Sequence, residues 1–291
     1  MLATALRFFL LVEIGLYLAV AIRGFALSPL AALFATVAVI LGSRAGIVGV
    51  TYLAAQAEHS PAPRLTVMQW LRMAGAEYLA FLRLFLVIQP FERWWMGEDR
   101  LPPGRRVLLL VHGYGCNRGA WWWLRARLER AGYVVATLNL EPPNVAIDHY
   151  AEAIDGRLAT LCRETGVDRL TLIGHSMGGL AARAYLRQHG GERVEQLITL
   201  ATPHAGSTLA RLGIGANARQ MEAGSLWLGA LGPLPGGLAA VSVRNSHDNF
   251  VMPQDNQRLD GARDVELPAL GHLAMLFSPR LAQILLDALR R

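Results

Sequence analysis

The chain of 291 residues is long enough for one large globular domain and an additional segment. Hydrophobic residues make up 53% and charged residues 17%, which is apolar for a soluble enzyme and indicates association with a membrane. The formal net charge is +6, but all 28 basic residues are dispersed arginines without a basic tract or nucleic-acid motif, so attraction to anionic lipid headgroups explains the charge better than nucleic-acid binding.

Two long apolar runs lie within the first 60 residues. The first, residues 8–22, contains one charged residue, Glu13, and the second covers residues 29–50. Each approaches the ~20 residues that cross a bilayer. A cleaved signal peptide is the alternative for the first run, but its glutamate and the second run close behind favour a transmembrane hairpin over residues 1–60. A charge inside a span is costly, so we expect Glu13 to face the partner helix or lie near a helix end.

Residues 61–104 contain a third apolar segment. Arg72 and Arg83 are eleven positions apart, three helical turns, and therefore share one face of the expected helix. This pattern suits a helix lying at the headgroup level, or a third crossing. The pair Trp94 and Trp95 is typical of a membrane–water boundary. We expect an interfacial helix and linker here. Because arginines flank every run, the side of the membrane is not determined.

From residue 105 onward, strand-like and helix-like segments alternate. This alternation predicts a parallel sheet covered by helices on both faces, with catalytic groups at the carboxyl ends of the strands. We therefore expect an α/β catalytic domain over residues 105–291. The expected strands are residues 106–111, 133–140, 169–173, 194–201, 238–243 and 265–267, and the expected helices are residues 120–130, 146–164, 179–188 and 279–290.

The most informative motif is Gly174-His175-Ser176-Met177-Gly178, a G-x-S-x-G pattern between an apolar strand and an amphipathic helix. Such an abrupt turn strains the backbone at the serine and exposes its hydroxyl, while the glycines allow strand and helix to approach closely. The amides at the start of the helix point to where an oxyanion would form. Ser176 is therefore the candidate nucleophile, and a tight turn with an incidental serine is the alternative.

A serine nucleophile needs a base, an acid that orients the base, and donors for the oxyanion. His272 follows the last expected strand and precedes the final helix, so it lies at the carboxyl end of a strand, in the chain order serine, acid, histidine. Asp248 lies just after an expected strand and is favoured as the acid over Asp255, which lies on a less rigid loop. Four other histidines are expected to be structural or surface residues: His59, His149, His175 and His189.

Two backbone amides are expected to form an oxyanion hole. One is that of Met177, and the other is that of Tyr114 in the loop His112-Gly113-Tyr114-Gly115. The elbow, this loop and the segment Ala201-Thr202-Pro203-His204-Ala205-Gly206-Ser207 together resemble the α/β-hydrolase superfamily, in particular bacterial triacylglycerol lipases and carboxylesterases. The resemblance covers roughly residues 105–291.

The resemblance implies an α/β-hydrolase fold with a Ser176–Asp248–His272 triad, the Tyr114 and Met177 amides as oxyanion donors, and a structural role for His204. The chain differs from secreted lipases in its membrane-like first hundred residues and in lacking a calcium-site pattern. Neither secretion nor calcium dependence is therefore implied. We expect no cofactor and no metal, and the two cysteines, Cys116 and Cys162, form no disulfide framework.

Residues 206–237 interrupt the alternation. A helix is expected from residue 218 to residue 231, with Asn217 as its N-cap. Its apolar stripe comprises Met221, Leu226, Trp227 and Leu231, and the last three are the expected substrate-binding residues. This stripe either packs on the core or, as a small cap over the nucleophile, lines a pocket for an acyl chain.

These features predict a membrane-anchored serine hydrolase, a lipase or carboxylesterase, that cleaves esters of hydrophobic acyl groups through an acyl-enzyme. An acyltransferase or thioesterase would use the same triad, and a catalytically silent binding protein on this fold is a further alternative. The expected partners are a lipid or hydrophobic ester and the membrane, with no nucleic acid. The expected location is a bacterial inner membrane, as a multi-pass protein. The sequence does not predict the exact ester or the oligomeric state.

Overall fold

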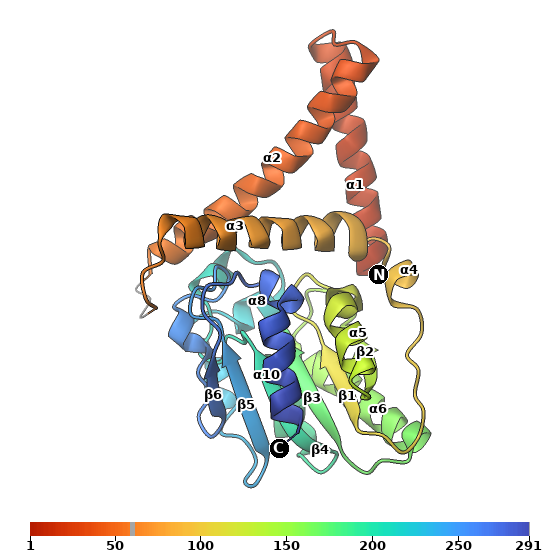
Figure 1. Ribbon diagram of the computed structural model, residues 1–291, viewed down its shortest axis with the longest axis vertical. Coiled ribbons are helices and arrows are strands. Elements are labelled where there is room, and N and C mark those ends of the chain that lie inside the picture. Colours follow the sequence, from red (N-terminus) through yellow and green to blue (C-terminus); the bar gives the residue numbers. More distant parts are fainter. Residues whose placement is uncertain (59–61, 291) are drawn as a thin grey trace.

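The computed structural model describes residues 1–58 and 62–290 and contains a helical hairpin, a long crossing helix and an α/β domain (Figure 1). The hairpin consists of α1 (Leu2–Ala19) with a π-helical extension (Val20–Gly24), and α2 (Pro29–Gln56). Both arms are long and apolar enough to cross a membrane, and only 6% and 17% of their most apolar windows are buried. They are therefore not core helices of the kind found inside soluble domains. The expected boundary at residue 60 lies outside the described residues.

Polar contacts hold the two arms of the hairpin together. The carboxylate of Glu13 pairs with the guanidinium of Arg44 on α2 and accepts a hydrogen bond of 3.0 Å from the hydroxyl of Tyr17. Glu13 thus faces the partner helix, as expected, and its charge is compensated within the hairpin. Helix α2 begins where Pro29 occupies the first helical position and the hydroxyl of Ser28 caps the helix.

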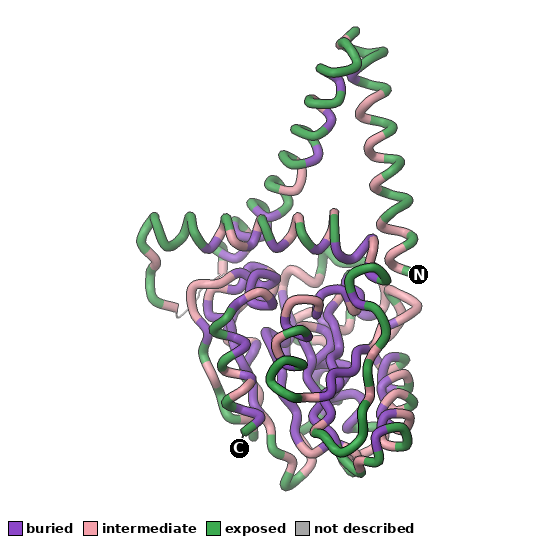
Figure 2. Tube along the Cα trace, turned by 45° about the vertical axis from the view of Figure 1, so that its right-hand side comes forward, coloured by how far each residue is buried: buried purple, intermediate pink, exposed green. Residues whose placement is uncertain are grey.

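A long helix lies between the hairpin and the α/β domain. Helix α3 (Val67–Leu82) starts with a capping box formed by Thr66 and Gln69 and continues as a π-helical segment (Arg83–Ile88). It crosses the top of the α/β domain beneath the hairpin (Figure 2). Its buried residues Glu77 and Ala80 contact the α/β domain, whereas Met73 packs against α2. Helix α3 is not among the described helices that are long and apolar enough to cross a membrane.

The α/β domain is built on six parallel strands in the order β2-β1-β3-β4-β5-β6. Apolar side chains of the central strands alternate between the two faces, so each face has its own core cluster. The fold predicted from the sequence, a parallel sheet with flanking helices, is confirmed. The strands are β1 (Val107–Val111), β2 (Val134–Leu138), β3 (Leu170–His175), β4 (Val194–Leu200), β5 (Ala239–Arg244) and β6 (Arg263–Glu266).

Two pairs of helices cover the sheet. Helices α5 (Trp122–Arg130) and α10 (Pro279–Leu289) contribute to the cluster on one face, and α6 (Ile147–Thr165) and α7 (Met177–His189) to the cluster on the other. Short helical segments complete the chain: α4 (Glu92–Met96), α8 (Ala216–Gln220), α9 (Leu226–Ala230), and the 3-10 turns Arg118–Trp121, Thr208–Leu212, Gln254–Gln257 and Ala274–Phe277.

The crossing helix packs more closely on the domain than we expected. Residues 61–104 were predicted to form a separate interfacial helix and linker. In the structure, however, Leu84 and Ile88 lie in the same core cluster as Trp121 and Leu276. An apolar helix face can be covered either by lipid or by protein, and the sequence alone does not distinguish the two. Residues 80–88 of this segment therefore contribute to the core of the α/β domain.

The insertion also differs from the prediction. The single helix expected over residues 218–231 is two short helices, α8 and α9, separated by a turn in which Gly224 has a φ of 79°. Helix α8 is capped by Gly215, and Asn217 is buried inside it. Ser225 caps α9 by accepting a hydrogen bond of 3.2 Å from the amide of Leu228. A glycine in the left-handed region followed by a serine cap ends one helix and starts the next.

Candidate active site

The strand-to-helix turn after β3 has the strained geometry that its motif predicts. Ser176 has φ 53° and ψ −126°, and its amide donates a hydrogen bond of 2.8 Å to the carbonyl of Leu200. A Cβ atom at Gly174 would lie 2.5 Å from the amide nitrogen of Gly179, and one at Gly178 would lie 2.2 Å from the carbonyl oxygen of Val111. The two motif glycines are thus required by close backbone packing on both sides of the serine.

A histidine and an aspartate from two separate loops meet beside this turn. The Nδ1 atom of His272 donates a hydrogen bond of 2.7 Å to Oδ2 of Asp248, a fully buried carboxylate. The other oxygen of Asp248 accepts hydrogen bonds of 2.7 Å and 2.8 Å from the amides of Phe250 and Val251. Asp255, the alternative acid, has a side chain that is 46% exposed and pairs with Arg258 instead. The structure thus brings Asp248, and not Asp255, against His272.

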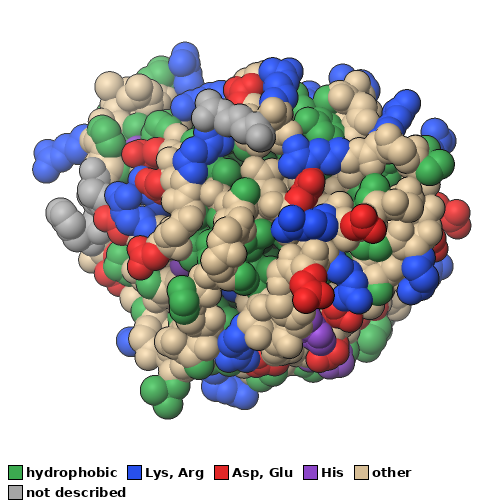
Figure 3. Space-filling view, turned by 90° about the horizontal axis from the view of Figure 1, so that it is seen from below, with side chains coloured by type: hydrophobic (Ala, Val, Ile, Leu, Met, Phe, Trp, Pro, Cys, Tyr) green, Lys and Arg blue, Asp and Glu red, His purple; other side chains and the backbone are tan. Residues whose placement is uncertain are grey.

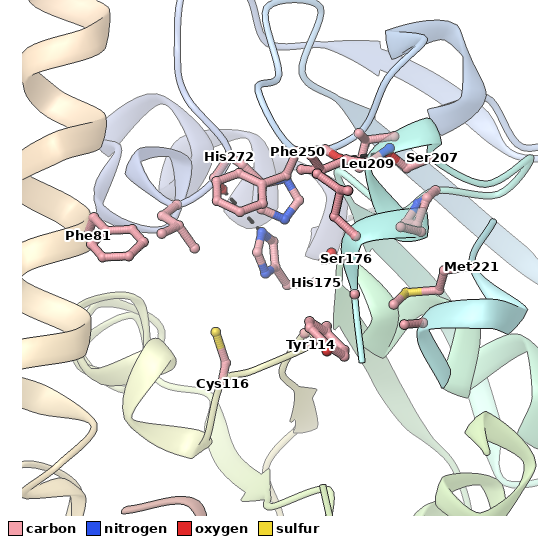
Figure 4. Close-up of a pocket in the computed structure, with 18 of the residues that line it drawn as sticks. Phe81, Tyr114, Cys116, His175, Ser176, Ser207, Leu209, Met221, Phe250 and His272 are labelled. Carbon is pink, nitrogen blue, oxygen red and sulfur yellow. Dashed lines mark hydrogen bonds between the residues drawn. The ribbon is translucent and has the colours of Figure 1, made fainter. Parts of the chain in front are cut away.

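The surroundings of His272 set its protonation. Burial alone would lower the pKa of His272, but the charge and hydrogen bond of Asp248, together with the charge of Glu77, raise it above its usual value. His175 lies against it, with ring centroids 4.6 Å apart. Burial and the neighbouring His272 hold the pKa of His175 well below its usual range, so His175 is neutral. Its Nε2 donates a hydrogen bond of 3.2 Å to the carbonyl of His272, which is a structural role (Figure 4).

Ser176 and His272 line a common cavity of about 380 Å³, which is in the size range of small-molecule sites. Figure 4 shows side chains from several elements converging on it. The wall is mainly apolar, and its largest side chains are those of Ile47, Phe81, Phe85, Tyr114, Leu209, Leu212, Met221, Phe250 and Leu273.

The loop after β1 lies directly beside the serine. A Cβ atom at Gly113 would lie 2.9 Å from Cβ of Ser176, so only glycine permits this approach. The hydroxyl of Tyr114 fixes the loop, because it accepts a hydrogen bond of 2.9 Å from the amide of Ile214 and donates one of 2.9 Å to the carbonyl of the same residue. Within the described residues, the amides of Tyr114 and Met177 have no hydrogen-bond acceptor. Two free amides at this position suit an oxyanion hole.

One buried carboxylate near the base was not predicted from the sequence. Glu77 on α3 is fully buried and accepts hydrogen bonds from the amides of Leu273 (3.0 Å) and Ala274 (2.7 Å), the two residues after His272. A Cβ atom at Gly271 would lie 2.3 Å from Oε2 of Glu77. Burial raises the pKa of Glu77 to about 7, against the opposing effect of the two amides. A lone carboxylate in an otherwise apolar segment is the sequence signal that could have identified it.

A second contact joins the same loop to α2. Asn249, next to the acid, accepts a hydrogen bond of 3.0 Å from the amide of His272 through its Oδ1 atom. Its amide nitrogen donates a hydrogen bond of 2.8 Å to the hydroxyl of Thr51 on α2. The hairpin and the crossing helix therefore each bind the loops that carry Asp248 and His272.

Three of the four residues in the predicted apolar stripe, including all those expected to bind substrate, lie away from the cavity. Leu226 is 93% exposed, Leu231 is buried in the core cluster on the α6–α7 face, and the indole of Trp227 donates a hydrogen bond of 2.6 Å to Asp148. None of the three lines the cavity that contains Ser176. The break between α8 and α9 turns these three residues away from the cavity, whereas Met221, the fourth residue of the stripe, and the segment around Leu212 line it.

Three other predicted histidines lie in structural or surface positions. His204 is buried and donates a hydrogen bond of 3.1 Å to the hydroxyl of Thr199, while His149 is exposed and His189 stacks on Tyr185. His59 lies outside the described residues. Among the residues that are described, no three His, Cys, Asp or Glu side chains are grouped so as to hold a metal ion.

Comparison with known proteins agrees with this architecture. The protein family described as the alpha/beta hydrolase fold matches residues 106–222. Two solved structures superpose on 67% of the chain: Bacillus licheniformis lipase BlEst2 in its mature form (TM-score 0.57, 18% identity, 96% of that chain) and Aspergillus fumigatus lipase B (TM-score 0.58, 16% identity, 55% of that chain). The chain has the α/β-hydrolase fold.

Two bacterial enzymes are similar to this α/β-hydrolase-fold chain in sequence. A triacylglycerol lipase of Burkholderia plantarii is 31% identical over 127 residues, which is 40% of this chain and 34% of that protein. A triacylglycerol lipase of Pseudarthrobacter phenanthrenivorans is 31% identical over 124 residues, 38% of this chain and 37% of that protein. The matched region thus spans about a third of each relative, and the similarity to bacterial lipases is distant.

The buried position of Glu77 generates a prediction about stability. Glu77→Ala leaves the amides of Leu273 and Ala274 without an acceptor, which should lower the free energy of unfolding by about 1–3 kcal/mol per unsatisfied group. Glu77→Gln keeps an acceptor oxygen and should cost less. The measurement is thermal or denaturant unfolding of the detergent-solubilised protein.

The same pair of variants gives a pH dependence with a defined sign. Because the pKa of Glu77 is raised in the folded state, the folded protein binds a proton at this carboxyl more tightly than the unfolded chain does. The resulting contribution to the free energy of unfolding is complete below pH 4.5 and is lost as the pH rises through about 7. The parent should therefore lose stability relative to Glu77→Gln between pH 5 and pH 8. A difference between the two proteins that does not change with pH would contradict a folded-state pKa of Glu77 that burial raises.

Proposed function

We propose that this chain is a membrane-anchored serine ester hydrolase, a lipase or carboxylesterase, with Ser176 as nucleophile, His272 as base and Asp248 as the acid that orients the base. The observation that carries the proposal is the 2.7 Å hydrogen bond from His272 to a fully buried Asp248, beside a strained serine that lines the same cavity as His272. A buried acid–base pair next to an activated hydroxyl is the arrangement that acyl transfer requires.

The chemistry follows from the atoms that face the cavity. Because Nδ1 of His272 donates to Asp248, Nε2 has the lone pair that removes the proton from Ser176 as the hydroxyl attacks the ester carbonyl. The amides of Tyr114 and Met177 stabilise the developing oxyanion, and Asp248 stabilises the imidazolium. His272 then returns the proton to the leaving alcohol. Water, activated by the same histidine, releases the acid from the acyl-enzyme.

The wall of the cavity supports a hydrophobic acyl group as substrate. Aromatic and aliphatic side chains line it, including Leu209, Met221 and Phe250. The distant similarity to triacylglycerol lipases points to the same class of ester. Apolar walls with a few convergent polar groups at one end suit a substrate with a hydrocarbon chain and one ester bond.

The hairpin supports membrane attachment. Large apolar side chains on both arms are exposed, among them Phe8 (62%), Phe9 (66%) and Phe34 (67%), and a lipid bilayer would cover them. The opposite end of the molecule is different: seen from below, arginine and acidic side chains are scattered over its surface (Figure 3). We assign α1 and α2 to the membrane, α3 to the headgroup level, and the α/β domain to the aqueous side.

The catalytic assignment predicts three graded effects. Ser176→Ala should abolish labelling by a fluorophosphonate probe and lower ester hydrolysis by several orders of magnitude. Asp248→Asn should lower kcat by about 10³- to 10⁴-fold, because the base loses its orientation and its counter-charge. Asp255→Asn is the matched control and should remain within about threefold of the parent, since Asp255 is exposed and pairs with Arg244 and Arg258, not with His272.

Folding of each variant is checked by its unfolding midpoint. Retained activity in Ser176→Ala, or a loss in Asp255→Asn that exceeds the loss in Asp248→Asn, would contradict the proposed triad. Reaction of the parent with neither the probe nor any ester would contradict the proposed activity as a whole.

Membrane attachment predicts a second outcome. The full-length protein should remain in the membrane pellet after washing with high salt and with alkaline carbonate, because spanning helices are not held by charge. A variant with Arg72 and Arg83 both changed to Ala should behave identically, since Arg72 on α3 and Arg83 on its π-helical continuation are both exposed. Release of the parent by either wash would indicate peripheral binding and would contradict the assignment of α1 and α2 to the bilayer.

A further inference from the structure

Helices outside the α/β domain form one wall of the cavity that contains Ser176. Ile47 comes from α2, Phe81 from α3, and Phe85 from the π-helical continuation of α3. Phe81 projects from its helix toward the cavity (Figure 4), and the rings of Phe81 and Phe85 lie 4.6 Å apart. This apolar end of the cavity, called the passage below, extends from Ser176 to α2, which we assign to the membrane, and to α3, which we assign to the headgroup level.

The position of Ile47 on α2 shows where this passage leads. Ile47 lies nine residues before the end of the helix at Gln56, which corresponds to about 14 Å along the helix axis. Its side chain is 47% exposed, and its helical neighbours Val50 (57%) and Leu53 (67%) are also exposed. The cavity therefore reaches a stretch of α2 whose outer surface is apolar, at a depth where the proposed span lies among lipid chains.

Another part of the rim is apolar as well. The turn Thr208–Leu212 supplies Leu209 and Leu212 to the cavity wall, and Leu212 and Ile214 are 77% and 74% exposed. The hydroxyl of Tyr114 holds this segment at Ile214. Exposed leucine and isoleucine next to a ligand cavity are typical of a surface that contacts lipid.

We propose that the substrate is a long-chain ester that resides in the bilayer, and that its acyl chain moves sideways from the membrane past Ile47 and Phe81 to place the ester carbonyl at Ser176. This inference rests on the proposed ester hydrolase activity and specifies its substrate class. The free-energy cost of moving a hydrocarbon chain through water grows with each methylene group. A passage that opens at the level of the lipid chains avoids this transfer, whereas a water-dissolved short ester gains nothing from it.

The test changes the size of the side chain at the membrane end of the passage. Ile47→Trp should narrow the passage, and Ile47→Phe should do so to a smaller extent. Val50→Trp, one turn further along α2 and outside the cavity wall, is the matched control for adding a bulky side chain to this helix. Each protein is reconstituted in phosphatidylcholine vesicles. Hydrolysis is measured with a long-chain diacylglycerol dissolved in the same bilayer and with water-soluble p-nitrophenyl butyrate.

The quantity compared is the ratio of the two rates. We expect Ile47→Trp to lower the ratio of long-chain to short-chain hydrolysis at least tenfold, Ile47→Phe to give an intermediate value, and Val50→Trp to keep the parent ratio. An unchanged ratio in Ile47→Trp, or an equal fall in Val50→Trp, would overturn the proposed route. Fluorophosphonate labelling of Ser176 reports folding of each variant, and Ile47→Phe carries the test if Ile47→Trp does not label. A parent that hydrolyses neither ester would contradict the proposed function itself, which is a different outcome.

Discussion

The hydrogen bonds from the amides of Leu273 and Ala274 to the buried carboxylate of Glu77 are the contact on which the candidate active site most depends. They join the loop that carries His272 to a helix that lies outside the sheet. Without these bonds, two buried amides would lack an acceptor and a buried carboxylate would lack donors. Each group therefore offsets the free-energy cost of burying the other. The position of His272 is therefore fixed by α3 on one side and by the sheet on the other.

This constraint couples the site to the helical region. Thr51 on α2 reaches the same loops through Asn249, and Ile47 and Phe81 complete the cavity wall. The carboxyl edge of the sheet, where a hydrolase fold places its chemistry, is thus the edge that faces the hairpin. The hairpin, the crossing helix and the α/β domain are built as one structure, and a change in the helices can alter the geometry of the site without touching the sheet.

Sequence predicted the parts of this protein that depend on local pattern. Buried parallel strands read as apolar runs, and the turn at Ser176 has a motif whose glycines are required by atomic contact, so strands and elbow were placed to within a few residues. His272 and Asp248 were chosen by their positions after strands, and the structure brings them together.

Contacts between distant segments were not predictable in the same way. Glu77 lies 196 residues before Leu273, and nothing in the residues around it indicates that partner. The apolar face of α3 could equally have faced lipid, so its packing on Trp121 and Leu276 was missed. In the insertion, the apolar stripe suggested one continuous helix, whereas Gly224 and Ser225 divide it and turn Trp227 toward Asp148.

The most direct test of the account is a structure of the detergent- or nanodisc-embedded protein after reaction with a hexadecyl fluorophosphonate. The account predicts phosphorus bonded to Oγ of Ser176, a phosphoryl oxygen at the amides of Tyr114 and Met177, and an alkyl chain that runs past Phe81 to Ile47. Phosphorus on another residue, or an alkyl chain that leaves the cavity on the side away from α2 and α3, would contradict it.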